Sequence, residues 1–272
     1  MGRAKDIIVK VIPAKVANEF VKKNHYSGKV VNNSTLHFGC FLDGKLHGVM
    51  SYGSPLDKRK VLPLVQPSLW NEMLELNRMA FDDYLPKNSE SRCFAISVKL
   101  LKKNAPHIKW ILSFSDGTQC GDGGIYRASG FVLTGVAKNQ NTCKLPSGEV
   151  IHKMTLESNP TSTRKELNGL SYYGLTDGRY DFNKYVEFVK GEVLIGFQLR
   201  YIYLIDKTCE ITVPVLPFSK IDEMGAGMYK GERVSIQERR QQHADEALPA
   251  VRLASSQEEG FDSTHPLKIN KD

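Results

Sequence analysis

The stretch MLELNRMAF, residues 73–81, decides the fold because it combines an apolar strand pattern with polar side chains in its middle. We expect a central strand here. A helix over 89–103 follows, capped by Asn88 or Ser89. Next comes IKWILSF, residues 108–114, whose apolar run predicts a second buried strand. A strand, a helix and a strand in this order indicate α/β packing.

On both sides of this unit the hydrophobic pattern alternates between strand and helix periods. Asp43-Gly44 is a tight-turn pair between two strand patterns, which predicts a hairpin. The patterns predict strands over 7–12, 36–42, 46–52, 131–137 and 197–205, and helices over 14–23 and 125–129. We therefore expect an α/β (α+β) sandwich with a central mixed sheet flanked by helices.

Length and composition fit one main domain with a charged tail. The 272 residues are 41% hydrophobic and 25% charged, which is ordinary for a soluble globular protein. We expect the main domain over 1–220, with a polar insertion at about 157–180, and a helical or extended tail over 221–272. No segment approaches 18 apolar residues, and the N-terminus lacks a signal-peptide pattern, so we expect a soluble, intracellular protein without membrane contact.

Charge and cysteine content narrow the classes of partner and ligand. The formal net charge of +7 favours polyanionic partners, although many basic proteins never bind nucleic acid. The five cysteines include no C-x-x-C pair, which excludes a zinc knuckle and indicates reduced thiols. The histidines show no metal-ligand spacing, so a metal site is neither indicated nor located.

The central strand carries more polar groups than a buried strand needs. Strand alternation places Glu75 and Asn77 on one face, and Leu76 and Arg78 on the other. An unpaired buried charge is expensive, so these groups require partners. Two explanations stay open, a structural ion pair or a functional site.

Two further segments lie where a sheet of this type binds ligands. The run Asn88–Arg92 opens a helix, and a helix N-terminus can hold an anion, although a well-capped helix explains it equally. Ser113–Asp116 ends a buried strand and is followed by Gly117–Gly124, whose glycines let backbone approach a ligand. His25-Tyr26 ends the first helix and could border the same cleft. We expect a site at these strand ends, with a generic glycine-rich turn as the alternative.

These segments, in this order, resemble the Mom proteins of Mu-like phages, a divergent branch of the GNAT acyltransferases. The resemblance runs through most of residues 20–220. It is carried by His25-Tyr26, LHGVMSYG (46–53), Glu75–Arg78, Asn88–Arg92, Ser113–Asp116, Gly124–Ala128, LRYIY (199–203) and LPFSK (216–220). The chain departs from the GNAT pattern in lacking the glycine-containing coenzyme A loop after the central strand.

The resemblance implies a set of site residues in a GNAT-like catalytic domain. The residues implied as catalytic are Arg78, Ser113, Asp116 and Tyr126. Those implied to bind substrate or donor are His25, Tyr26, Tyr52, Glu75, Asn77, Asn88, Ser89, Ser91, Gly121 and Gly124. Lysines on two helices, Lys22, Lys23, Lys99, Lys102 and Lys103, could track phosphates, or could simply be solvated.

The resemblance also implies an activity. Mom proteins add a methylcarbamoyl group to the exocyclic amine of adenine in double-stranded DNA, which protects phage DNA from host restriction. We therefore expect a DNA-modifying transferase in the cytoplasm of a bacterial host, working on double-stranded DNA with an activated donor, as a monomer or a homodimer. The donor stays open between an acyl-CoA and an aminoacyl-tRNA, and iron is a candidate metal that the sequence does not locate.

Two other functions remain as alternatives. An ordinary GNAT N-acetyltransferase for a small molecule or a protein would need coenzyme A binding, and the missing loop argues against it. A non-enzymatic DNA-binding protein would need a recognition helix with interleaved Arg and Asn, and the sequence shows none.

Overall fold

A computed structural model describes residues 3–118, 121–229, 232–235 and 237–238. In this part of the chain, eight strands form one sheet in the order β1-β2-β3-β5-β6-β9-β7-β8. Their bounds are β1 (Ile8–Val11), β2 (Ser34–Leu42), β3 (Lys45–Gly53), β5 (Met73–Phe81), β6 (Trp110–Asp116), β7 (Val132–Lys144), β8 (Val150–His152) and β9 (Glu192–Leu204). Only β5 and β6 pair in parallel; the other neighbours in this sheet are antiparallel. The predicted central mixed sheet is confirmed.

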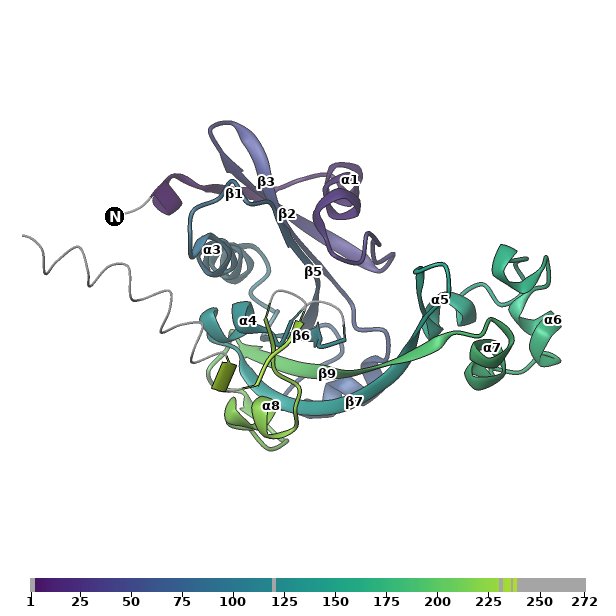
Figure 1. Ribbon diagram of the computed structural model, residues 1–272. Helices are drawn as coiled ribbons and strands as arrows, with labels where there is room; N and C mark the ends of the chain where they lie inside the picture. Colours follow the sequence, from purple (N-terminus) through teal and green to yellow (C-terminus); the bar gives the residue numbers. More distant parts are fainter. Residues whose placement is uncertain (1–2, 119–120, 230–231, 236, 239–272) are drawn as a thin grey trace, which may run out of the picture. The chain divides into compact units, whose positions relative to one another are not determined.

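Helices cover both faces of this sheet (Figure 1). The helices of the described part are α1 (Ala14–Asn24), α2 (Lys58–Val61), α3 (Ser89–Asn104), α4 (Gly124–Ala128), α5 (Lys153–Glu157), α6 (Tyr172–Thr176), α7 (Phe182–Phe188) and α8 (Ser219–Glu223), of which α5, α6 and α7 lie away from the sheet faces. The described residues also form short 3-10 turns and strands: η1 (Arg3–Asp6), η2 (Leu62–Leu64), η3 (Lys165–Leu167), β4 (Val65–Gln66), β10 (Glu210–Ile211), β11 (Met228–Tyr229) and β12 (Glu232–Arg233). No helix among the described residues is both long and apolar enough to cross a membrane.

Strand alternation assigns α1 and α3 to opposite faces of the sheet. Ala17 and Val21 of α1 pack with Val49 of β3. The next residue, Met50, points the other way and packs in the main core, to which α3 contributes Cys93, Phe94, Val98 and Leu101. The described cysteines, Cys40, Cys93, Cys143 and Cys209, are free thiols.

A β-bulge interrupts the alternation of β5. Arg78 pairs with Ser51 and Leu76 with Tyr52, so Asn77 has no partner in the register. The bulge turns Arg78 onto the same face as Glu75, which pairs with Gly53. The prediction that Arg78 lies opposite Glu75 is therefore wrong, because one extra residue inverts the alternation beyond it.

The parallel strands β5 and β6 separate soon after they meet. They pair at Met73–Trp110, Leu74–Ile111 and Glu75–Leu112, and then diverge toward their carboxyl ends. At the first unpaired position, the Ser113 hydroxyl donates to the carbonyl oxygen of Leu76 at 3.0 Å. A side chain thus bridges the two strands where the backbone ladder ends.

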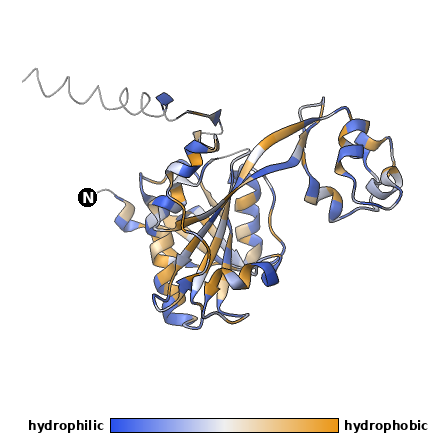
Figure 2. Cartoon of the chain, turned by 90° about the horizontal axis from the view of Figure 1, so that it is seen from below, coloured by the Kyte–Doolittle hydropathy of each residue, from blue (hydrophilic) through white to orange (hydrophobic). Residues whose placement is uncertain are grey.

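The strands β7 and β9 extend past the sheet and form an arm. Their pairing continues from Val132–Ile202 to Lys144–Glu192. Figures 1 and 2 show the two strands reaching away from the sheet, with α5, α6 and α7 beyond them. The segment 143–191 has its own core, formed by Cys143, Leu145, Ile151, Leu156, Leu167, Tyr172, Phe182 and Tyr185. The polar insertion expected at 157–180 lies within this folded segment.

Both arm strands are longer than the sequence predicts. The expected strands 131–137 and 197–205 cover only the part that packs on the main core. The outer residues 138–144, KNQNTCK, lack an apolar alternation because they pair outside that core.

Toward its C-terminus, the chain divides into two compact units, 1–233 and 234–272. Residues 239–272 of the expected tail lie outside the described part.

The bridge between β5 and β6 gives a stability prediction. Ser113→Ala removes a buried donor from the Leu76 carbonyl. We expect the free energy of unfolding to fall by about 1–2 kcal/mol in urea titrations. Ser162→Ala, at an exposed serine of the arm, is the matched control. A loss no larger for Ser113→Ala than for this control would contradict the bridging role.

Candidate active site

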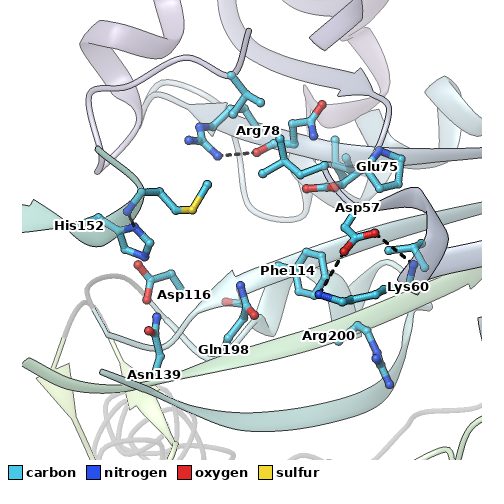
Figure 3. A pocket seen from close by; sticks show the side chains of 18 of the residues that line it. Asp57, Lys60, Glu75, Arg78, Phe114, Asp116, Asn139, His152, Gln198 and Arg200 are labelled. Atoms are coloured by element: carbon cyan, nitrogen blue, oxygen red, sulfur yellow. Dashed lines mark hydrogen bonds and ion pairs between the residues drawn. The ribbon is translucent and has the colours of Figure 1, made fainter. Parts of the chain in front are cut away.

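The separation of β5 from β6 opens two cavities that meet between the strands. The arm-side cavity has a volume of about 520 Å³, and its walls come from β5, β6, α2, β9 and the arm (Figure 3). The α4-side cavity, of about 250 Å³, lies against Gly121–Tyr126. Six residues line both: Tyr26, Asn77, Arg78, Phe114, Ser115 and Asp116. Two ligands could therefore approach from different sides and meet at this gap.

Arg78 lies at the junction of the two cavities. Its Nε donates to the Lys29 carbonyl at 3.0 Å, and its NH1 donates to the Asn77 carbonyl at 2.7 Å. These bonds fix the guanidinium with two of its five N–H groups. The others can serve an anionic ligand, since planar guanidinium groups bind oxyanions well.

Asp116 ends β6 and faces the arm. One carboxylate oxygen accepts from the Thr118 backbone N–H at 2.8 Å. Figure 3 shows His152 of the arm across from Asp116, with Asn139 and Gln198 beside it. His152 accepts from the Met154 N–H through Nδ1 at 3.1 Å, which leaves the Nε2 proton as its donor. Burial lowers the pKa of His152, while Asp116 opposes that shift.

Sequence reasoning missed the arm-side residues of this polar group. They are Asn139, His152, Gln198 and Arg200, all of which line the arm-side cavity. They come from β7, β8 and β9, far along the chain from β6. Gln198 pairs with Asp116 in the antiparallel register, a relation that single-sequence patterns do not contain. Of the four, only Arg200 lies within a stretch quoted for the resemblance, LRYIY.

His25 and Tyr26 form the wall opposite the arm. The His25 Nδ1 accepts from the Ser27 N–H at 3.2 Å and lies 2.8 Å from the Ser27 hydroxyl. Burial, and secondarily the Arg78 charge, lower the pKa of His25 to about 4. The imidazole is therefore neutral at neutral pH. Tyr26 packs on its ring at 4.3 Å and stays half-exposed at the junction of the cavities.

Tyr126 belongs to a rigid wall of the α4-side cavity. Its ring lies 5.1 Å from Tyr201 and 5.3 Å from Phe131. Gly123 has a φ of +79°, and a Cβ there would clash with the Tyr201 ring, so only glycine fits. Gly121 and Gly124 line the same cavity. The glycine-rich turn thus lets its backbone pack against the Tyr201 ring and also line the cavity.

Glu75 and Asn77 also reach the cavity wall. Burial raises the pKa of Glu75, although Asn77 and Arg78 oppose that shift. The Asn77 side-chain oxygen accepts from the Ser34 hydroxyl at 3.0 Å. Of the two explanations given by the sequence, these contacts favour polar groups held at the wall of a site over a structural ion pair of Glu75.

Five of the proposed site residues line none of the four cavities described in the structure. Tyr52 and Ser113 are buried, and the Tyr52 hydroxyl lies 2.7 Å from that of Ser97. Asn88, Ser89 and Ser91 lie at the start of α3, where both serine hydroxyls bond to nearby carbonyl oxygens. The structure gives these residues roles in holding the core and the helix end.

Metal ligands do not gather among the described residues. No group of three or more His, Cys, Asp or Glu side chains lies close enough there to hold an ion. His37 lies 2.8 Å from the Ser51 hydroxyl, and His47 lies 2.9 Å from Asp82.

Comparison with known proteins identifies one family. The model of the Mom protein family matches residues 6–220. The methylcarbamoylase Mom of Escherichia phage Mu is 33% identical over 156 residues, which span 57% of this chain and 64% of the phage protein. The match thus covers somewhat less than two thirds of that relative.

Among solved structures, GNAT acetyltransferases show remote similarity. An IAA acetyltransferase from Bacillus cereus is 9% identical, with a TM-score of 0.39 over 73% of this chain and 99% of its own. An N-acetyltransferase from Staphylococcus aureus is 10% identical, with a TM-score of 0.37 over 73% of this chain and 97% of its own.

The environment of His25 gives a titration prediction. In histidine NMR spectra of the folded protein, His25 should titrate near pH 4. Because its folded pKa lies below the unfolded value of 6.5, His25 should reduce stability as pH falls from about 6.5 to about 4. Arg78→Gln should raise this pKa but leave it below 6.5, since burial is the larger cause. Loss of the signal in His25→Gln assigns it, and a midpoint at or above 6.5 would contradict the buried setting.

Proposed function

The chain belongs to the Mom protein family, and from this premise we propose that it is an enzyme that modifies adenine in double-stranded DNA. The reaction proposed is transfer of a methylcarbamoyl group to the exocyclic amine, as the name of the phage Mu relative suggests. Protection of phage DNA from host restriction would be its biological result. The observation that carries this proposal is the gap between β5 and β6, where two cavities share Arg78 and Asp116.

An adenine amine inside a duplex cannot reach this gap. The base is stacked and paired, so it must be extruded, at a cost of roughly a few kcal/mol. The arm-side cavity, at about 520 Å³, falls within the usual range for small-ligand sites. It shares residues with an open groove of about 880 Å³ lined by Lys22, Lys29 and Arg78. We assign the extruded adenine to this cavity and the DNA backbone to the groove.

The proposed chemistry forms one bond and breaks one. Adenine N6 attacks the transferred carbon of the donor, and the bond from that carbon to the leaving group breaks. Asp116 accepts the proton that N6 loses, because a carboxylate at the gap can bond to the amine and serve as its base. Arg78 holds the oxygen on which negative charge develops. The Tyr126 hydroxyl supplies a further donor from the α4-side wall.

The donor enters from the α4 side in this scheme. We keep two classes for it, an acyl-CoA and an aminoacyl-tRNA; each has an activated carbonyl carbon, and the coenzyme A sulfur or the terminal ribose oxygen of the tRNA leaves and takes up a proton. Because His25 is neutral at neutral pH, it would neither repel Arg78 nor compete with it for a negatively charged group of the donor. Ser113, assigned a catalytic role from the resemblance, would instead maintain the gap by bridging to Leu76.

The carboxylate and the tyrosine hydroxyl provide the test of this scheme. Asp116→Asn and Tyr126→Phe should each reduce modified adenine by about 100-fold, since each removes one transition-state interaction. Both variants should keep DNA affinity, because neither side chain is assigned to phosphate. The measurement is nucleoside mass spectrometry of plasmid DNA from expressing cells, beside gel-shift titration of the purified proteins.

Asp83→Asn, at an exposed aspartate, is the matched control and should modify adenine as the wild type does. Wild-type levels of modification in both site variants would refute the assigned roles. An unmodified adenine pool in cells expressing the wild type would refute the proposed function itself.

A further inference from the structure

Leu56 is an apolar side chain held in solvent at the mouth of the arm-side cavity. At 78% exposed, it is the most exposed large hydrophobic residue in the described part of the chain. It lines the arm-side cavity, the open groove and a third pocket of about 470 Å³ beside Trp70. Because Leu56 lines three neighbouring hollows, its side chain projects between them.

The loop that carries Leu56 is fixed at both ends. Before it, Pro55 is buried, which anchors the backbone and fixes its φ angle. The Asn33 side chain donates to the Ser54 carbonyl. After it, the Asp57 carboxylate caps α2 by accepting from the Lys60 N–H at 3.3 Å. The loop therefore presents Leu56 outward instead of letting it fold back onto apolar surface.

The surroundings of Leu56 fit a polyanion. Lys58, Arg59 and Lys60 follow one residue later, and the intervening Asp57, the one acidic residue of the loop, forms an ion pair with Lys60 at 3.1 Å. Lys22 and Lys29 line the groove that Leu56 borders. An apolar tip set among cations matches the duplex, whose charged backbones enclose an apolar base stack.

We propose that Leu56 enters the base stack of duplex DNA and fills the space left when the adenine is extruded into the arm-side cavity. The inference rests on the proposed function. The side chain lies at the entrance of the cavity assigned to the base, so the vacated space in the stack is next to it. Inserted apolar side chains unstack base steps in DNA-bending proteins. Lys58, Arg59 and Lys60 would hold the phosphates on that side.

Leu56→Ala tests this role without disturbing the fold, because the side chain is mostly in solvent. The matched control is Leu170→Ala, at a half-exposed leucine of the arm that lines none of the four cavities. The full-length proteins are mixed with plasmid DNA at saturating concentration and treated with permanganate, which oxidises unstacked thymines. This readout needs no donor, and the modified adenines mapped on the same plasmid from expressing cells give the positions to compare.

With the wild type and Leu170→Ala, we expect reactive thymines opposite the adenines that become modified in cells. With Leu56→Ala, thymine reactivity and the amount of modified adenine should each fall at least fivefold, while DNA affinity changes less than threefold. Circular dichroism melting curves should be the same for all three proteins.

Three results would overturn the inference. Leu56→Ala could modify adenine as the wild type does, it could lose modification with unchanged thymine reactivity, or the wild type could leave every thymine unreactive. Each leaves the proposed function standing as long as the wild type modifies adenine. If the wild type modifies none, the proposed function fails and the wedge role fails with it.

Discussion

The site depends on the parallel strands β5 and β6, which pair over three residues and then diverge. β5 and β6 share three residue pairs, after which the Ser113 hydroxyl carries the last bond between them, to Leu76. Beyond this point neither strand has the other as a neighbour, and the groups that line the gap must find other partners. Arg78 bonds to the carbonyls of Lys29 and Asn77, and Asp116 bonds to the Thr118 amide. The polar side chains of the central strand β5, such as Arg78, are therefore not buried in the core, because they line the gap where β5 and β6 no longer pair.

The electrostatics of the gap follow from its partial burial. Burial lowers the pKa of His25 and of His152 and raises that of Glu75, because it disfavours the charged form of each of these three groups. Arg78 stays charged because a guanidinium is not deprotonated in proteins. The result is a neutral His25 beside a fixed cation, with Asp116 across the gap. In the proposed scheme, this arrangement separates the positive charge assigned to the donor from the carboxylate assigned to accept the proton.

Features of the fold and the site could be predicted from the sequence where they depend on neighbouring residues, and not where they depend on partners far along the chain. The strand 73–81 and the helix from Ser89 agree with the structure because apolar periodicity is a property of neighbouring residues. The predicted side-chain cap is wrong: Asn88 stands at the N-cap position but makes no capping hydrogen bond, and the Ser89 hydroxyl donates to the Pro86 carbonyl. The bulge at Asn77 could not be predicted, since it is defined by the partner strand and leaves no mark in the alternation. His152 was missed for a similar reason: it is an ordinary residue of a polar segment until the arm brings it to Asp116. Gly121, Gly123 and Gly124 pointed to the right turn, but Gly123 is required by Tyr201, which lies far away in the chain.

The arm explains why a small polar insertion could matter to the main sheet. Its outer strands are hydrophilic, yet its own core holds α5 in place, so that His152 and Met154 face the cavity from a folded unit rather than from a loose loop. Lys29, in the segment that carries the opposite wall, donates to the Thr155 hydroxyl at 3.2 Å and spans the groove. An exposed contact of this kind contributes little stability and is easily broken. Because this weak contact bridges two folded walls of an already open groove, the groove can widen for a DNA strand without unfolding either wall.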